Sequence, residues 1–120
     1  PTSPLRKVVD IDNAIELLKD DVKSIVSVTE SEHSPLWSNI LPEDKSLKKF
    51  INPKFKNMRS QDLPIFYRIN GAIYVAEVDY LLNNDGFLGD DSKAYIMTQD
   101  SSIDIDDSID FLLAELLILK

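Results

Sequence analysis

The sequence of 120 residues contains no cysteine, one histidine, one tryptophan and only three glycines. Without cysteine, the chain has no disulfide, no thiolate nucleophile and no Cys-ligated zinc or iron–sulfur site. The single histidine, His33, makes a His-rich metal site or a Ser-His-Asp triad nearly impossible. The glycines, Gly71, Gly86 and Gly89, are too dispersed to form a Gly-rich loop that cradles phosphate.

Long apolar runs and positive charge are also missing. No apolar segment reaches the roughly 20 residues that a membrane-spanning helix needs. The net charge of −8 argues against binding to nucleic-acid backbones or anionic membranes, which attract basic surfaces. The apolar content of 43% is ordinary for a folded protein, and 120 residues suit one domain. We therefore expect a single cytoplasmic domain that binds neither nucleic acid nor a membrane.

An acidic stretch at residues 100–107, with the sequence DSSIDIDD, is the most informative part of the chain. In an extended backbone, Asp104 and Asp106 point to one side and the isoleucines to the other. Adjacent carboxylates repel each other unless a cation lies between them, and Mg²⁺ accepts a site of one or two carboxylates completed by water and phosphate. The pattern predicts either a Mg²⁺ site or a solvated acidic loop in which Asp106 or Asp107 caps the last helix.

Apolar periodicity predicts alternating helices and strands, which indicates an α/β fold. Helices are expected at about 10–19, 78–83 and 107–119, and strands at 24–29, 72–75 and 93–97. Short strands at 37–41 and 47–51, with a turn at 44–46, would form a hairpin that projects from the sheet. Gly86 is expected to end the second helix as a left-handed C-cap. Because a helix and then a strand open the chain, we expect a further strand just before Pro1.

Two other stretches have the composition of a binding site. Residues 52–59 carry Lys54, Lys56 and Arg59, and this basic patch is either a solvated loop or a clamp for phosphate or carboxylate. Asn70 and Gly71 precede a buried apolar strand, and Arg68 stands just before them, where it could face an anion. Glycine there allows a ligand to approach the backbone, although Asn-Gly is also an ordinary hairpin signal.

Four motifs occur in a fixed order along the chain. They are PTSPLR at 1–6, RINGAIY at 68–74, YIM at 95–97 and SIDID at 102–106. In order and spacing the set resembles the acylneuraminate cytidylyltransferases, which are the CMP-sialic acid synthetases and their relatives for pseudaminic and legionaminic acids. The resemblance runs through essentially all 120 residues. It implies part of a nucleotide-sugar transferase sheet, Rossmann-like and three-layered, flanked by helices, with a projecting dimerisation segment at about 36–67.

The resemblance also implies a reaction and a set of site residues. Members of the family join CTP and a nonulosonic acid, giving the CMP-sugar and pyrophosphate in the presence of Mg²⁺. By resemblance, Asp104 and Asp106 act in catalysis by holding the metal. The implied substrate-binding residues are Arg59, Arg68, Asn70, Tyr74 and Phe87. Of these, Phe87 would close the sugar pocket of a partner subunit, so we expect a homodimer or a higher oligomer.

The chain departs from the family on the nucleotide side, because the Gly- and Lys-rich loop that cradles the CTP phosphates has no counterpart here. We therefore expect the C-terminal portion of such an enzyme, inactive by itself because half of the groups that position the reactants are missing. The alternatives are a non-catalytic remnant or standalone module that oligomerises and binds an acidic sugar, and an acidic interaction domain. An uncovered sheet edge and apolar face would promote self-association.

Overall fold

The structure is a computed structural model that describes residues 2–120, and these residues form two compact units. The sheet unit comprises the residues up to Thr29 together with Arg68–Lys120, and the loop unit comprises Glu30–Tyr67. Within residues 2–120, no helix has both the length and the apolar character needed to cross a membrane.

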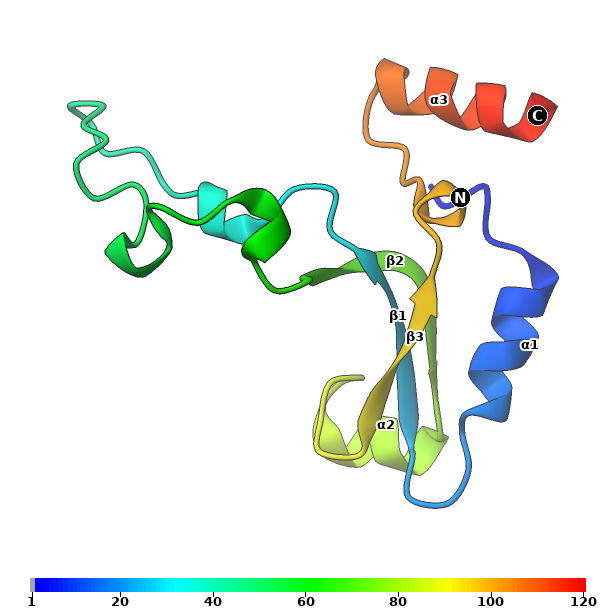
Figure 1. Ribbon diagram of the computed structural model, residues 1–120. Coiled ribbons are helices and arrows are strands. Elements are labelled where there is room, and N and C mark those ends of the chain that lie inside the picture. Colours follow the sequence, from blue (N-terminus) through cyan, green and yellow to red (C-terminus); the bar gives the residue numbers. More distant parts are fainter. Residues whose placement is uncertain (1) are drawn as a thin grey trace. The chain divides into compact units, whose positions relative to one another are not determined.

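A three-stranded sheet forms the centre of the sheet unit (Figure 1). Its strands are β1 (Ser24–Glu30), β2 (Tyr67–Ala76) and β3 (Ser92–Met97), in the spatial order β2-β1-β3. The strands β1 and β3 are parallel, with Ser24 opposite Ser92. The strand β2 is antiparallel to β1. Its direction follows from a 2.9 Å hydrogen bond that the N–H of Glu77, just after β2 ends, donates to the carbonyl of Lys23, just before β1 begins. This mixed sheet with helices around it confirms the expected α/β class, and all three expected strands are present.

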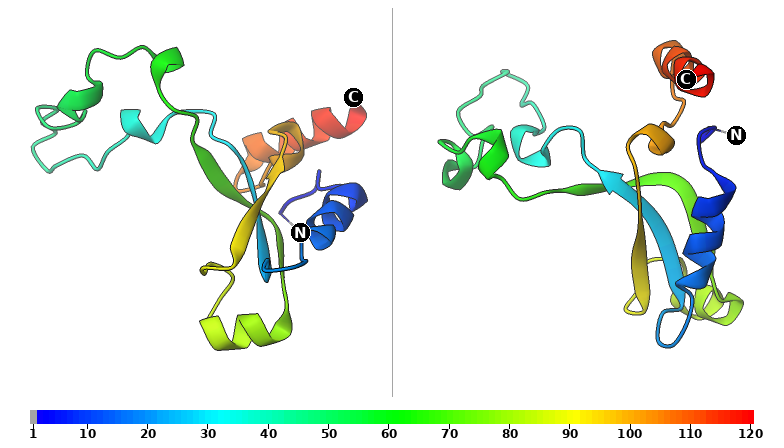
Figure 2. Two further views of the ribbon diagram at one scale, coloured as in Figure 1. Left: turned by 60° about the horizontal axis from the view of Figure 1, so that its bottom comes forward. Right: turned by 45° about the vertical axis from the view of Figure 1, so that its right-hand side comes forward.

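Helix α1 (Val8–Glu16) covers one face of the sheet (Figure 2). Its fully buried Ala14 joins a core cluster with Ile25, Ala72, Ile73 and Met97. The helix begins and ends earlier than the expected range of 10–19. The reason for the early start is local: the backbone N–H of Lys7 donates to the carboxylate of Asp10 at 3.1 Å, so the aspartate lies inside the first turn rather than before it.

Helix α2 (Val78–Asn84) connects β2 to β3 at the expected place and buries Tyr80. The residue that ends it is not the one expected. Asp85 adopts the left-handed conformation, with φ of 51° and ψ of 43°, whereas Gly86 has φ of 141° and lies outside that region. Aspartate tolerates a left-handed backbone better than most residues, so the glycine is not needed at the cap itself.

Helix α3 (Ser108–Leu119) begins one residue after Asp107, which confirms the expected helix and selects between the two candidate caps. The carboxylate of Asp107 accepts a hydrogen bond of 2.9 Å from the N–H of Asp110. In return, the carboxylate of Asp110 accepts 3.2 Å and 3.0 Å bonds from the N–H groups of Asp107 and Asp106. This reciprocal capping box places two carboxylates at the positive end of the helix dipole.

The loop unit contains three 3₁₀ turns, which lie on either side of the range where the hairpin was expected. They lie at Pro35–Trp37, Pro53–Phe55 and Ser60–Asp62. The predicted strands at 37–41 and 47–51 are wrong, since neither range forms a strand. Ser34 and Asn52 each precede a proline, and their side chains accept hydrogen bonds from the N–H groups two residues ahead. These side-chain turns satisfy backbone N–H groups just before and just after the expected hairpin. The expected turn near 44–46 is present, with Lys45 donating to Pro42 at 2.9 Å.

Candidate functional site

A buried hydrogen-bond network lies where the sheet meets the acidic stretch. At its centre is Asn70, whose side chain is 3% exposed. Its carbonyl oxygen accepts bonds from the hydroxyl of Ser27 at 2.6 Å and from the N–H of Ala72 at 3.2 Å. Its amide donates to the hydroxyl of Ser102 at 2.9 Å and to the sulfur of Met97 at 3.4 Å. One asparagine thus connects β1, β2 and the segment after β3.

The acidic stretch is anchored at both of its ends. It starts with a 3₁₀ turn at Asp100–Ser102, in which the hydroxyl of Ser102 donates to the carbonyl of Thr98 at 2.6 Å. Further along, the N–H of Ile105 donates to the carbonyl of Thr2 at 2.8 Å. The N-terminal segment therefore holds the backbone directly beside Asp104. The bond between Ile105 and Thr2 brings together the last and the first of the four motifs.

The two predicted metal ligands differ in their surroundings. Asp104 is half-buried, and its Oδ1 atom is buried without any hydrogen-bond partner. Asp106 is exposed, and its backbone N–H faces the capping carboxylate of Asp110. A buried carboxylate oxygen without a partner is costly, and a cation bound there would remove that cost.

These residues fit a Mg²⁺ ion of the kind that keeps water and phosphate among its ligands. Asp104 and Asp106 offer hard carboxylate oxygens, of which one is buried and unpartnered. Within residues 2–120, no group of three or more His, Cys, Asp or Glu side chains is arranged to hold a metal ion. An all-protein cage is therefore absent from the described residues, while a site with one or two carboxylates matches the usual coordination of Mg²⁺.

An aromatic pair stands at the opposite end of the sheet. The rings of Tyr74 and Phe87 have centroids 5.3 Å apart and planes inclined by 56°. The carbonyl of Phe87 accepts a 2.7 Å bond from the hydroxyl of Ser24, the first residue of β1. Asp104, by contrast, follows the far end of β3, which runs parallel to β1. A strand of this length spans about 20 Å, so within one chain the aromatic pair and the acidic stretch do not share a pocket.

The two predicted arginines lie in different surroundings. Arg59 belongs to the loop unit, is exposed and pairs through Nε with the carboxylate of Asp62 at 3.0 Å. Earlier in the same basic stretch, the ammonium of Lys54 lies 5.6 Å from the ring centroid of Phe55. Arg68 is half-buried on β2 in the sheet unit. Binding of substrate by Arg59, Arg68, Asn70, Tyr74 and Phe87 stays a prediction.

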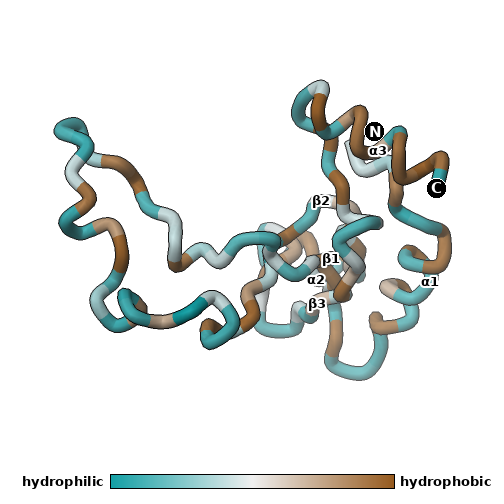
Figure 3. Tube along the Cα trace, turned by 45° about the horizontal axis from the view of Figure 1, so that its top comes forward, coloured by the Kyte–Doolittle hydropathy of each residue, from teal (hydrophilic) through white to brown (hydrophobic). Residues whose placement is uncertain are grey.

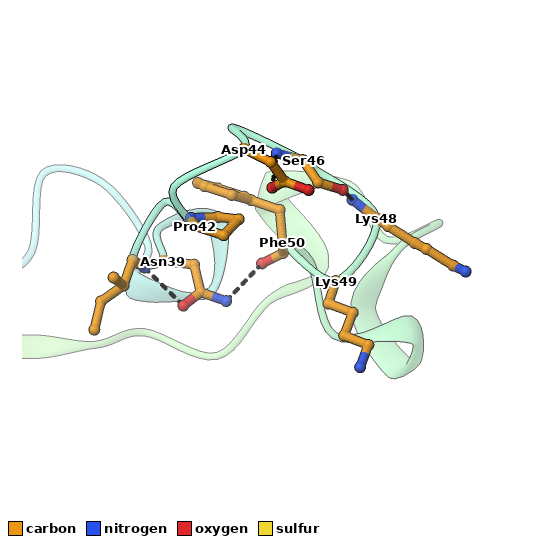
Figure 4. A pocket seen from close by; sticks show the side chains of 8 residues that line it. Asn39, Pro42, Asp44, Ser46, Lys48, Lys49 and Phe50 are labelled. Atoms are coloured by element: carbon orange, nitrogen blue, oxygen red, sulfur yellow. Dashed lines mark hydrogen bonds between the residues drawn. The ribbon is translucent and has the colours of Figure 1, made fainter.

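The loop unit holds a hollow of about 390 Å³ that the sequence did not indicate (Figure 4). Two hydrogen bonds shape its wall: Asn39 donates to the carbonyl of Phe50 at 3.1 Å, and the N–H of Ser46 donates to Asp44 at 3.0 Å. The side chain of Lys48 extends away from the hollow in this view. Without a convergent charged group, the hollow has no evident chemistry.

Ser27 and Ser102 are parts of the buried network that the sequence reasoning missed. Ser27 is fully buried in β1, where it also accepts a 2.8 Å bond from the N–H of Ile73. A serine among β-branched residues of a central strand is a usable signal, because a buried hydroxyl needs a partner. Such a serine predicts a polar neighbour, but the sequence does not tell which residue that neighbour is.

Tyr95 forms a second link between the sheet and α1. Its hydroxyl donates to the carboxylate of Asp10 at 2.9 Å. Burial raises the pKa of Tyr95 above its ordinary value, a hydrogen bond with Asn13 opposes that rise, and the hydrogen bond and negative charge of Asp10 add to it. The raised pKa keeps the proton on the Tyr95 hydroxyl, which donates a hydrogen bond to the Asp10 carboxylate.

Comparison with known proteins gives a consistent set of relatives, although no protein-family profile matches the chain. The chain is 35% identical over 122 aligned positions to a CMP-N,N'-diacetyllegionaminic acid synthase of Legionella pneumophila, which covers 96% of this chain and 50% of that protein. It is 35% identical to an N-acylneuraminate cytidylyltransferase of Escherichia coli O18:K1:H7, covering 95% of this chain and 27% of that protein. Over nearly all of its own length, this chain is therefore homologous to a CMP-legionaminic acid synthase and to an N-acylneuraminate cytidylyltransferase.

A third relative matches a similar share of this chain. The post-translational flagellin modification protein B of Campylobacter coli is 28% identical over 98% of this chain and 49% of its own length. The chain thus spans about half the length of two of these three relatives and about a quarter of the other. The matches confirm the family resemblance drawn from the four motifs.

Proposed function

We propose that this chain supplies the sugar-acid and metal side of a cytoplasmic enzyme that transfers CMP from CTP to a nonulosonic, sialic-type acid and releases pyrophosphate. The main support is the similarity to a named CMP-sugar synthase and a named cytidylyltransferase over 95–96% of the chain. The buried, unpartnered Oδ1 of Asp104 at the carboxyl end of β3 supports the metal part of the proposal.

In this proposal, Asp104 and Asp106 hold Mg²⁺, which neutralises negative charge that develops on the phosphates during transfer. The protein's own contribution is to fix the position of these carboxylates. The bond from Asn70 to Ser102 fixes the turn before Asp104, and the bond from Ile105 to Thr2 fixes the backbone after it. Because the carboxylates are already held in position, less conformational entropy is lost when the metal and substrate bind.

The aromatic pair is proposed to contact the sugar acid. Tyr74 is 48% exposed, and its ring tilted against Phe87 leaves an apolar surface for a substituted sugar. Because this pair and Asp104 lie at opposite ends of the sheet, a complete site would combine Phe87 of one copy with the carboxylates of another. That requirement supports the proposed homodimer.

The 120 residues alone are proposed to be inactive, since they contain no Gly-rich loop to hold the CTP phosphates. The test measures Mg²⁺-dependent pyrophosphate release from CTP and N-acetylneuraminate, with a full-length relative as positive control. The wild-type chain should release no more pyrophosphate than a variant that combines Asp104→Asn with Asp106→Asn. Release clearly above that of the double variant would refute the inactivity.

A second candidate is a non-catalytic module that oligomerises and binds an acidic sugar. The observation that favours it is the exposure of apolar side chains on α3, which suits association better than solitary function. The two candidates differ in metal dependence. A module of this kind would bind the sugar equally well with and without Mg²⁺, whereas the proposed enzyme portion requires the ion.

A further inference from the structure

Thr29 carries a buried polar group that the proposed site does not use. It is the last residue but one of β1, and its side chain is fully buried. Within residues 2–120, two buried side-chain atoms have no hydrogen-bond partner, namely Oγ1 of Thr29 and Oδ1 of Asp104. Because buried polar groups are nearly always paired, two unpaired ones in one small sheet unit call for an explanation.

The side chain of Thr29 lies on the face of the sheet that carries the Asn70 network. Side chains alternate along a strand, so Thr29 points to the same face as Ser27, whose hydroxyl bonds to Asn70. In the parallel register Thr29 stands opposite Met97, and the sulfur of Met97 accepts a 3.4 Å bond from the Asn70 amide. Thr29 therefore adjoins the network at the carboxyl end of β1.

Asp104 reaches the same end of the sheet from the chain that follows β3. Ser102 is 1% exposed and bonded to Asn70, and Asp104 follows it by two residues, at most about 7 Å of extended chain. Residues 103–106 alternate between hydrophobic and hydrophilic, as the colours of Figure 3 show, and the isoleucines on both sides of Asp104 are half-buried. The two unpaired atoms thus belong to the same end of the sheet.

These two atoms have complementary hydrogen-bonding needs. A threonine hydroxyl can donate a bond, whereas a carboxylate oxygen only accepts. They do not bond to each other directly, since neither has a partner within bonding distance. A water molecule between them would accept from Thr29 and donate to Asp104, with the two oxygens about 4.5 Å apart, and water commonly joins buried polar groups in this way. Both atoms are buried by residues of this chain alone.

We propose that the hydroxyl of Thr29 holds the Asp104 carboxylate in position through one bridging water, which makes Thr29 a positioning residue. That the carboxylate binds Mg²⁺ rests on the proposed function. A carboxylate oxygen has two lone pairs, so Oδ1 can accept this bond and still bind a cation. Groups behind a metal ligand fix its orientation, and their removal typically weakens metal binding about 10- to 100-fold.

A crystal structure of the chain without added metal tests the bridge itself. It should show a water within about 3.2 Å of both Thr29 Oγ1 and Asp104 Oδ1. Thr29→Val, which keeps the shape of the side chain but not the hydroxyl, should lose this water, whereas Thr29→Ser should keep it. A Thr29 hydroxyl that bonds to another group and shares no partner with Asp104 would overturn the proposal.

Magnesium affinity tests the positioning role. In isothermal titration calorimetry, Thr29→Val should raise the Mg²⁺ dissociation constant about tenfold, and Thr29→Ser should leave it within about threefold. The control is Ile25→Val, a core change near the start of the same strand, which should lower stability to urea without changing Mg²⁺ affinity. A Thr29→Val variant that loses stability but binds Mg²⁺ as tightly as the wild type would show that Thr29 only packs.

The two measurements separate this proposal from the proposed function. If the wild-type chain binds no Mg²⁺ but its crystal structure shows the shared water, the metal part of the proposed function is wrong and the contact between Thr29 and Asp104 stands. If the wild type and Thr29→Val bind Mg²⁺ equally well, the metal site stands and the positioning role of Thr29 is refuted.

Discussion

The side-chain amide of Asn70 donates a 2.9 Å hydrogen bond to the hydroxyl of Ser102, which joins the middle of β2 to the turn that opens the acidic stretch. Because Ser27 on β1 donates to the same asparagine, three segments that are distant in sequence meet at one side chain. The position of Asp104 thus depends on a buried residue that belongs to a different motif.

Replacing Asn70 by alanine is expected to lower the free energy of unfolding by about 2 kcal/mol, since the change leaves buried polar groups without partners. Urea denaturation followed by circular dichroism measures this. Asn83→Ala, at an exposed position on α2, is the matched control and should be near neutral. Equal stability of the two variants would mean that the buried network contributes nothing.

Mg²⁺ binding should separate the aspartates by role. Isothermal titration calorimetry should show binding to the wild-type chain and its loss in Asp104→Asn, because that change removes the charge of the half-buried carboxylate. Asp107→Ala should keep Mg²⁺ binding while lowering stability by about 1 kcal/mol, since Asp107 caps α3. Unchanged Mg²⁺ binding in Asp104→Asn would remove Asp104 from the metal site.

The raised pKa of Tyr95 predicts a loss of stability in alkali. Above the ordinary pKa of 10.0, the unfolded tyrosine loses its proton while the folded one keeps it, so stability declines as the pH rises through the folded pKa. Below pH 10 this contribution is fully present. In denaturation measured across pH 9–12, Tyr95→Phe should show a shallower decline than the wild type. Equal slopes would show that Tyr95 does not titrate differently on folding.

The glycine inside β2, Gly71, is expected to be required because of its backbone conformation, and not because a side chain there would clash with its neighbours. Gly71 has φ of 71°, and a Cβ atom there would meet no heavy atom within 4 Å. Gly71→Ala should therefore cost about 1 kcal/mol through backbone strain alone. Gly71→Asn should cost less, because asparagine tolerates a left-handed backbone. Thermal denaturation compares the two, and an alanine variant as stable as the wild type would contradict the assigned φ.

The sequence predicted those elements whose signals are local. Strand β1 follows from its β-branched run, and the cap of α3 from an aspartate placed before an apolar periodicity. The strands expected at 37–41 and 47–51 failed because a strand needs a neighbour to pair with, and apolar residues alone do not supply one. Within this segment, backbone N–H groups instead find local side-chain acceptors, as Ile40 does at Asn39 and Lys48 does at Ser46.

The candidate site was harder to predict because its parts meet through contacts between distant residues. The motif around Asn70 indicated a site but did not show that the side chain is buried against Ser27 and Ser102. Likewise, the pairing of Tyr74 with Phe87 depends on the path of α2, which no spacing rule gives. Burial and partner choice are properties of the packed sheet, so only the structure could supply them.

Direct binding of the sugar acid tests the central claim, that this chain carries the sugar side of a cytidylyltransferase. Saturation-transfer NMR with millimolar N-acetylneuraminate and Mg²⁺ should show transfer from the wild-type chain, weakened at least about tenfold in Tyr74→Ala. A neutral hexose at the same concentration should show none. Absence of transfer from N-acetylneuraminate, or equal transfer from the hexose, would contradict the account.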